Sequence, residues 1–243
     1  MIAMILNSGV GKRMGELTRE KPKCMCDIGG GETILSSQLK VLKKAGIEKI
    51  VMTTGPFADV LMPYAREHAD GMEIEFVQNP KFAETNYIYS MYLARNSFGG
   101  GDDVILLHGD LVCEQSVIDD LCRVHGNAVA VETEADLPEK DFKAKMKGLS
   151  VVKIGVDVFG DDCAASQPAY RFTADAFSRW MDEIAWFCED GTVNVYAENA
   201  LNELLGKTVV LFVLPLCGRL CFEIDNAEDR DRVSRLYLEA QGE

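Results

Sequence analysis

Residues 1–23 of the chain read MIAMILNSGVGKRMGELTREKPK. The apolar run over residues 2–6 shows no alternation and stops at a glycine-rich loop, which predicts a buried parallel strand. Gly9 and Gly11 let the backbone approach a ligand closely and point its N–H groups at an anion. Three positive charges follow in the same segment, on Lys12, Arg13 and Lys23. The segment therefore predicts a phosphate-binding loop after the first strand.

Two common phosphate-binding motifs do not fit this loop. The dinucleotide motif G-x-G-x-x-G needs its third glycine one position before Gly15 and an acid about 20 residues further on, but the second strand ends in Thr53-Thr-Gly55. The Walker A motif G-x-x-x-x-G-K-[ST] is absent from the sequence. The remaining pattern, L-x-x-G-x-G-x-R-M…P-K from Leu6 to Lys23, resembles the signature loop of the sugar-nucleotide-type nucleotidyltransferases. A glycine-rich surface turn with incidental lysines is the alternative interpretation.

The composition excludes several classes of partner. Of 243 residues, 47% are hydrophobic, which is enough for a sizeable core. A net charge of −14 repels the phosphates of nucleic acids and of anionic membranes. The cysteines and histidines lack the spacing of a zinc site, and no stretch has the pattern of a signal peptide or a transmembrane helix. We therefore expect a reduced, cytoplasmic enzyme that binds no nucleic acid and does not insert into a membrane.

Strand and helix patterns alternate along the first half of the chain. They predict strands at 2–6, 47–53, 72–77, 104–107 and 128–132, and helices at 33–45, 58–68, 86–96 and 117–125. This alternation implies a mostly parallel sheet with helices on both faces. The rhythm then breaks, and we predict a charged loop at 134–147, strands at 149–154, 169–172, 209–214 and 219–224, and helices at 175–187, 194–205 and 227–238. We interpret 1–243 as one domain, with a nucleotide-binding half at 1–132 and an acceptor-binding, sheet-completing half at 133–243.

Two acidic residues follow apolar strands, at the strand ends where ligands bind in α/β sheets. Asp110 follows strand 104–107, and Asp225 follows strand 219–224. Two such carboxylates can share one Mg²⁺, which binds one or two protein carboxylates plus phosphate oxygens and waters. Either acid alone could instead cap the helix after it. Both together, beside the glycine loop, favour a metal site.

Two further segments carry a closer resemblance. Residues 79–94, NPKFAETNYIYSMYLA, resemble the N-x-x-[YF]-x-x-x-N-x-[IY]-Y-S segment of bacterial choline-phosphate cytidylyltransferases, and residues 223–229, EIDNAED, are similar to their closing E-I-D-N-x-x-D. Residues 166–168 and 196–202 look more like the cytidylyltransferases that handle phosphonates such as 2-aminoethylphosphonate. The resemblance covers nearly the whole chain. It implies an α/β, Rossmann-like nucleotidyltransferase (GT-A-like) fold with a small acceptor-binding insertion.

The resemblance also implies an activity, namely Mg²⁺-dependent transfer of CMP from CTP to a phosphoryl or phosphonyl oxygen, with release of pyrophosphate. Lys23 and Arg13 would be the catalytic cations, and Asp110 and Asp225 would bind Mg²⁺. The residues expected around CTP are Leu6, Asn7, Ser8, Gly9, Gly11, Lys12, Thr54, Gly55, Asn79 and Thr85. The residues expected around the acceptor are Asn86, Tyr89, Gln167, Tyr196, Glu198 and Asn199, with the Glu198 carboxylate facing an amine.

Three departures from the family pattern concern the site itself. Asn7-Ser8 stands in place of the usual Ala-Ala, His108 replaces the first acid of a frequent D-x-D, and Tyr87 replaces an asparagine. The acceptor therefore stays open between a small phosphonate (2-aminoethyl- or 2-hydroxyethylphosphonate) and phosphocholine. A sugar-1-phosphate nucleotidyltransferase using UTP or dTTP and a non-catalytic nucleotide sensor are the alternatives. The oligomeric state is also open, with a homodimer or fusion to a partner domain both compatible with the sequence.

Overall fold

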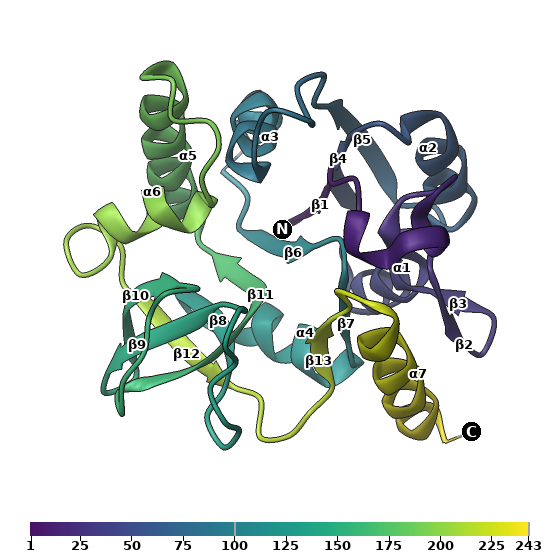
Figure 1. Ribbon diagram of the computed structural model, residues 1–243. Coiled ribbons are helices and arrows are strands. Elements are labelled where there is room, and N and C mark those ends of the chain that lie inside the picture. Colours follow the sequence, from purple (N-terminus) through teal and green to yellow (C-terminus); the bar gives the residue numbers. More distant parts are fainter. Residues whose placement is uncertain (100, 243) are drawn as a thin grey trace.

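The computed structural model (Figure 1) describes residues 1–99 and 101–242, with the side chain of Lys12 excepted. The helices are α1 (Ile34–Lys44), α2 (Ala58–Glu67), α3 (Tyr87–Ala94), α4 (Gln115–Arg123), α5 (Ala174–Glu189), α6 (Ala197–Leu204) and α7 (Ala227–Gln241), with short 3₁₀ helices η1 (Lys12–Thr18), η2 (Lys23–Met25) and η3 (Arg95–Ser97). The strands are β1 (Ile2–Asn7), β2 (Asp27–Gly29), β3 (Glu32–Thr33), β4 (Lys49–Thr54), β5 (Glu73–Gln78), β6 (Val104–His108), β7 (Leu111–Cys113), β8 (Asn127–Glu132), β9 (Lys143–Lys147), β10 (Ser150–Gly155), β11 (Cys163–Phe172), β12 (Leu211–Pro215) and β13 (Cys221–Glu223). Among these helices, none is both long enough and apolar enough to span a bilayer.

One nine-stranded sheet runs through the described residues in the order β5-β4-β1-β6-β11-β8-β12-β10-β9. Its first four strands are parallel, which confirms the arrangement predicted for the first half of the chain. Beyond them, β11 runs antiparallel to both β6 and β8, and β10 runs antiparallel to both β9 and β12. The sheet is therefore mixed rather than mostly parallel. One reason is local, because β9 and β10 are joined by a tight turn at Gly148, where φ is +63°.

Helices cover both faces of the sheet, as the alternating pattern predicted. Along β1, Ile2 and Met4 point into a core shared with α3, α5 and α6, whereas Ala3 and Ile5 point into a core shared with α1, α2 and α4. Successive side chains of a strand point to opposite faces, so a strand buried on both sides is continuously apolar. The first strand thus anchors both cores, and its carboxyl end carries the glycine-rich loop.

The prediction of a loop across 134–147 is wrong at its end, where β9 forms. This strand pairs with β10 and also with the start of β11, which closes the second half of the sheet on itself. The charged composition hid the strand, because three lysines alternate along it. Lys143 is fully buried, and its ammonium donates hydrogen bonds to the carbonyl oxygens of Pro138 at 2.8 Å and Asp141 at 2.9 Å.

A third, smaller core connects the C-terminal helix to the glycine-loop region. It joins Met14 of η1, Val112 of β7, Ile224 after β13 and Val233 of α7. Strands β7 and β13 form a separate antiparallel ribbon, and α7 packs beside β2 (Figure 1). This core fixes segments that are distant in sequence around the carboxyl ends of β1 and β6.

Candidate active site

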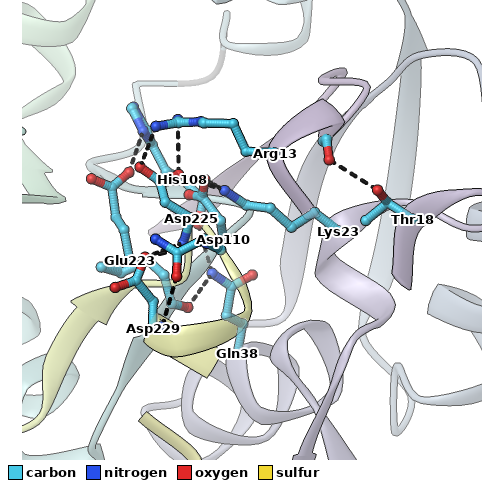
Figure 2. Close-up of polar contacts among 12 residues, drawn as sticks. Arg13, Thr18, Lys23, Gln38, His108, Asp110, Glu223, Asp225 and Asp229 are labelled. Carbon is cyan, nitrogen blue, oxygen red and sulfur yellow. Dashed lines mark hydrogen bonds and ion pairs between the residues drawn. The ribbon is translucent and has the colours of Figure 1, made fainter. Parts of the chain in front are cut away.

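The loop after β1 is packed against the segment that carries Lys23. Gly11 has φ +67°, in the left-handed region, where side chains other than glycine are strained. A Cβ atom at Gly11 would lie 3.2 Å from Thr18 Cγ2 and 3.3 Å from Lys23 Cβ. The Thr18 hydroxyl donates to the Gly11 carbonyl oxygen at 2.9 Å (Figure 2). The loop therefore lies directly against the base of the Lys23 side chain.

Two glycines, at the ends of the strands that flank β1, pack closely against the start of the loop. A Cβ atom at Gly55, which follows β4, would lie 2.2 Å from the carbonyl oxygen of Ser8. A Cβ atom at Gly109, which follows β6, would lie 1.8 Å from Asn7 Oδ1. No side chain fits at either position, so glycine is required there. The ends of β4 and β6 thus fix the path of the backbone at the start of the loop.

Lys23 lies between the two predicted metal acids (Figure 2). Its Nζ is 2.6 Å from Asp110 Oδ2 and 2.8 Å from Asp225 Oδ1, and the lysine side chain is only 14% exposed. Burial lowers the pKa of Lys23, but the charges of Asp110 and Asp225 outweigh burial and raise the pKa overall. The ammonium is therefore charged at neutral pH and is shared by two carboxylates.

Arg13 supplies a second cation to the same group. Its guanidinium forms a two-pronged contact with Asp225, with Nη2 2.9 Å from Oδ1 and Nη1 2.9 Å from Oδ2. The arginine side chain is 69% exposed, so solvent screens this ion pair and makes it weak. Arg13 can therefore leave Asp225 for another anion at small cost.

The β7–β13 ribbon explains why Asp110 and Asp225 meet. Leu111 lies opposite Glu223 in the ribbon, and the Ile224 N–H donates to the Asp110 carbonyl oxygen at 2.9 Å. Asp225 then precedes the capping residue of α7, and its own N–H donates to Asp229 at 3.1 Å. The sequence prediction that these two acids lie together is confirmed, whereas their role as metal ligands stays a prediction.

Three side chains to which the sequence analysis gave no role in the site, those of His108, Glu223 and Gln38, lie around Asp110. His108 ends β6, is 8% exposed, and has its Nδ1 3.3 Å from Glu223 Oε1. Burial and the charge of Asp110 raise the pKa of Glu223 to about 7. Burial lowers the pKa of His108, but the contact with Glu223 outweighs burial and raises it overall. Gln38 of α1 donates to the carbonyl oxygens of His108 at 2.7 Å and Leu111 at 2.8 Å, which fixes the backbone around Asp110.

Three cavities adjoin this group of charges. The first, of about 270 Å³, has on its walls Gly9, Gly11, Arg13, Lys23, Asp110 and Asp225. The second, of about 320 Å³, lies between the loop and α3, and its walls include Ser8, Asn79, Thr85, Asn86, Tyr87 and His108. The third, of about 590 Å³, lies between residues 132–141 and α7, and its walls include Glu132, Asp141, Gln167, Asp225, Asp229 and Arg232. Asp110 borders the first two cavities, and Asp225 borders the first and third.

Most residues predicted to bind CTP lie on the walls of the first two cavities, namely Leu6, Asn7, Ser8, Gly9, Gly11, Asn79 and Thr85. The Asn79 amide donates to the hydroxyls of Thr85 and Ser90, each at 3.0 Å. Thr54 and Gly55 lie behind the loop, away from these cavity walls, and Thr54 is fully buried. The predicted contact from the Lys12 side chain lies outside the described residues.

The residues predicted to bind the acceptor do not share one cavity. Asn86 borders the second cavity and caps α3, accepting a hydrogen bond from the Tyr87 N–H. Gln167 borders the third cavity. Tyr196 is 38% exposed, and its ring centre lies 5.9 Å from that of Tyr87.

Two other predicted acceptor residues lie elsewhere on the helices that carry them. Tyr89 stacks on Tyr92 of the same helix, with ring centres 5.9 Å apart, and the ammonium of Lys81 lies over the Tyr89 ring. Asn199 is exposed on α6. Neither side chain reaches the walls of the three cavities described above.

Glu198, the predicted partner of an acceptor amine, is fully buried. The Tyr170 hydroxyl donates to its Oε1 at 2.9 Å, and the Tyr87 hydroxyl donates to its Oε2. An acceptor amine would have to displace one of these hydroxyls to reach the carboxylate. The predicted role of Glu198 therefore requires a side-chain rearrangement at Tyr87 or Tyr170.

Asp110 fits a cation as it stands. Its Oδ1 is buried and has no hydrogen-bond partner within the described residues, while its Oδ2 contacts Lys23. Arg13 contacts both oxygens of Asp225 and Lys23 contacts one, so Asp225 fits a cation once Arg13 turns to another anion. Oxygen atoms of carboxylates are the ligands that Mg²⁺ prefers, so the pair suits this ion.

Comparison with known proteins places the chain among nucleotide-dependent transferases. The profile of the MobA-like NTP transferase domain matches residues 3–205. The chain is 34% identical over 119 residues to a CMP-5'-(3-aminopropyl)phosphonate synthase of Streptomyces rubellomurinus, a match that covers 49% of this chain and only 18% of that protein. It is 25% identical over 252 residues to the CTP:phosphoglutamine cytidylyltransferase of Campylobacter jejuni, covering 94% of this chain and 97% of the relative.

A solved structure of the CTP:phosphocholine cytidylyltransferase from Streptococcus pneumoniae superimposes on the chain with a TM-score of 0.76. The superposition covers 97% of this chain and 99% of the other, at 20% sequence identity. This likeness confirms the Rossmann-like α/β fold that the sequence predicted.

Proposed function

The chain belongs to the MobA-like NTP transferase family and is therefore a nucleotidyltransferase, and from this premise we propose that its nucleotide is CTP. It transfers CMP to a small phosphonate, such as 2-aminoethyl- or 2-hydroxyethylphosphonate, or to phosphocholine, and it releases pyrophosphate. The names of the relatives support this choice, since they act with cytidine nucleotides on small phosphorylated or phosphonylated molecules.

The observation that carries the proposal is the pair of cations beside the glycine loop. Lys23 and Arg13 both border the first cavity, and both are held there by carboxylates that a triphosphate can replace. Backbone N–H groups of the loop bind the phosphates, and the two cations neutralise the charge that builds up on the α- and β-phosphoryl oxygens. Catalysis of this kind needs no covalent intermediate on the protein.

The acceptor attacks the α-phosphorus in line with the leaving pyrophosphate. Its phosphonate or phosphate oxygen is already ionised at neutral pH, so the protein needs no general base. The protein's task is to hold two anions close together in the reactive orientation, which can supply about 7 to 11 kcal/mol of the barrier. Lys23 suits this task because it is buried, charged and fixed by two contacts.

We propose that Mg²⁺ assists the transfer at Asp110 and Asp225. When bound, the ion neutralises charge on the α-phosphate and the acceptor oxygen. The buried, unpartnered Oδ1 of Asp110 supports this assignment, because an empty acceptor in a low-dielectric site is costly without a cation or donor.

The third cavity is the better candidate for the acceptor headgroup than the surroundings of Glu198. It adjoins Arg13 and Asp225, and acids predominate on its walls, namely Glu132, Asp136, Glu139, Asp141, Glu223, Asp225 and Asp229. An acceptor with a cationic headgroup complements these carboxylates, while its anionic group faces Arg13. This arrangement favours 2-aminoethylphosphonate or phosphocholine over a phosphonate whose hydroxyalkyl headgroup is uncharged.

Pyrophosphate release tests the proposal directly. The purified protein with Mg²⁺ and CTP is offered phosphocholine, phosphoethanolamine, 2-aminoethylphosphonate, 2-hydroxyethylphosphonate, phosphoglutamine and glucose-1-phosphate in turn. UTP, GTP, ATP and dTTP replace CTP in parallel reactions. We expect release with CTP and one of the aminoalkyl or choline acceptors, and the CMP-linked product identified by mass spectrometry.

Two results would contradict the proposal. Release only with glucose-1-phosphate and UTP or dTTP would show a sugar-1-phosphate nucleotidyltransferase. CTP binding without release for any acceptor would favour a nucleotide sensor. The Lys23→Met variant serves as the catalytic control, because it keeps the volume of the side chain and removes its charge.

A further inference from the structure

We propose that His108, Asp110 and Glu223 form a mixed nitrogen and oxygen site for a divalent transition-metal ion. A nitrogen of His108 and one carboxylate oxygen from each of the two acids lie within 4.8 Å of one another. This set shares Asp110 with the Mg²⁺ site proposed above but replaces Asp225 by Glu223 and adds an imidazole. It therefore predicts a different ion preference for the same end of β6.

Unpartnered atoms point to a missing ligand in this cluster. Nε2 of His108 is buried, lacks a hydrogen-bond partner within the described residues, and belongs to a side chain that is only 10% exposed. Asp110 Oδ1 is likewise buried and unpartnered. Buried polar atoms without partners are rare because each costs free energy, and a cation coordinated by either atom would satisfy it. His108 and Asp110 also border the second cavity, from which an ion can enter.

The backbone segments that carry the three side chains are fixed before any ion binds. Gln38 holds the backbone carbonyls on either side of Asp110, and the β7–β13 pairing sets Glu223 opposite Leu111. An ion with ligands at about 2.1 Å holds neighbouring ligand atoms about 3 to 3.5 Å apart. Binding therefore needs the three groups to draw together by only about 1 to 2 Å.

The imidazole decides which ion the site prefers. Mg²⁺ takes oxygen ligands and dehydrates reluctantly, whereas imidazole nitrogen suits transition metals such as Zn²⁺, Fe²⁺ and Ni²⁺. The two carboxylates also suit Mn²⁺, which makes this ion a usable spectroscopic probe of the site. Lys23 does not block the site, because it contacts the other oxygen of Asp110. Glu223 contacts His108 Nδ1 and can either bind the ion or orient the ring for it.

The proposal extends the function given above, since Asp110 belongs to both sites, but its test needs neither CTP nor acceptor. Mn²⁺ alone is added to the metal-stripped protein, its dissociation constant is measured by titration, and pulsed electron paramagnetic resonance records whether a nitrogen nucleus is coupled to the bound ion. The wild-type protein is expected to show imidazole nitrogen coupling. Catalysis can be lost or retained without changing this readout.

Variants of His108 and Glu223 distinguish residues that bind the metal ion from residues that only support the structure. His108→Gln should remove the nitrogen coupling and weaken Mn²⁺ binding by more than the roughly 10- to 100-fold that loss of a supporting partner costs. His108→Asp should also remove the coupling but retain Mn²⁺ binding. The ratio of its dissociation constants for Mg²⁺ and Mn²⁺ should be smaller than that of the wild type. His125→Ala is the matched control, because His125 is exposed and outside the cluster, and its spectrum should equal that of the wild type. Glu223→Gln should weaken Mn²⁺ binding with the fold intact.

Bound Mn²⁺ without nitrogen coupling would overturn the proposal, as would coupling that persists in His108→Gln. Equal affinities of the wild-type protein for Mg²⁺ and Mn²⁺ would overturn the ion preference. A thermal melt of each variant shows whether it is folded, and His108→Asp keeps the test decisive if His108→Gln fails to fold.

Discussion

Replacing Lys23 by methionine would remove the positive charge that offsets the repulsion between two neighbouring carboxylates. Lys23 is the cation shared by Asp110 and Asp225, and all three side chains are largely buried, with 14%, 22% and 19% of their surfaces exposed. Methionine retains the aliphatic volume but leaves two carboxylates facing each other across a site with little water. Arg13 still neutralises part of the charge on Asp225, whereas Asp110 loses its ion-pair partner.

The size of the effect follows from the burial. Removing one partner of a buried ion pair costs about 3 to 5 kcal/mol. Because Arg13 remains and water reaches the site in part, we expect the lower end, about 3 kcal/mol of unfolding free energy. For a domain of this size that corresponds to a fall in Tm of about 6 to 12 °C. A divalent cation replaces the lost charge, so Mg²⁺ or Mn²⁺ should raise the Tm of the variant more than that of the wild type.

Calorimetric unfolding with and without the divalent ion measures this difference. Lys207→Met is the control, because Lys207 is 66% exposed and its ion pair with Glu203 should contribute less than about 1 kcal/mol. Turnover with CTP should fall by about 10²- to 10³-fold if Lys23 stabilises charge in the transition state. A Tm within about 2 °C of the wild type would refute the bridging role, and a change confined to the KM for CTP would refute the catalytic one.

Three further changes test the frame around the site. Gly55→Ala would place a methyl group 2.2 Å from the Ser8 carbonyl oxygen, so we expect a loss of at least about 3 kcal/mol of stability, or no folding, in denaturant titration; a stable variant would contradict the close approach. Asn226→Ala removes the side chain that accepts from the N–H groups of Glu228 and Asp229 at the start of α7, and it should cost about 1 kcal/mol; an unchanged midpoint of urea unfolding would show that this cap is dispensable. Asp110→Asn should raise the divalent-ion concentration needed for half-maximal turnover by at least about 10-fold, whereas an unchanged requirement would remove Asp110 from the metal site.

The sequence predicts best what depends on neighbours along the chain. The apolar strand, the glycine loop and the cations after it are local, and the structure confirms that they form one cavity wall. The helices were predicted with small errors at their ends because their caps and apolar periodicity are also local. Asp110 and Asp225 could be paired because each follows a strand, and strand ends meet at one edge of a sheet.

Features set by distant contacts were missed. The strand predicted at 219–224 is confirmed as β13, but its partner β7 has only three residues and carries no pattern, so the contact of Glu223 with His108 could not be foreseen. The strand β9 was hidden by its lysines, of which Lys143 is buried through contacts with carbonyl groups of the preceding loop. Glu198 was assigned to an acceptor because its sequence context gives no sign of Tyr170, which lies 28 positions earlier and holds it inside the core.

The β7–β13 ribbon also bears on how the protein acquires its activity while folding. Cys113 and Cys221 face each other in the ribbon although they lie 108 positions apart in sequence. Closing so long a loop is slow, because its entropic cost precedes any gain from the contacts it makes. The four parallel strands β5, β4, β1 and β6 all lie within residues 2–108, whereas Asp225 reaches their carboxyl ends only when the ribbon closes. We therefore expect a refolding intermediate with a formed sheet and little capacity to transfer a nucleotide, and activity should return more slowly than secondary structure in a stopped-flow experiment.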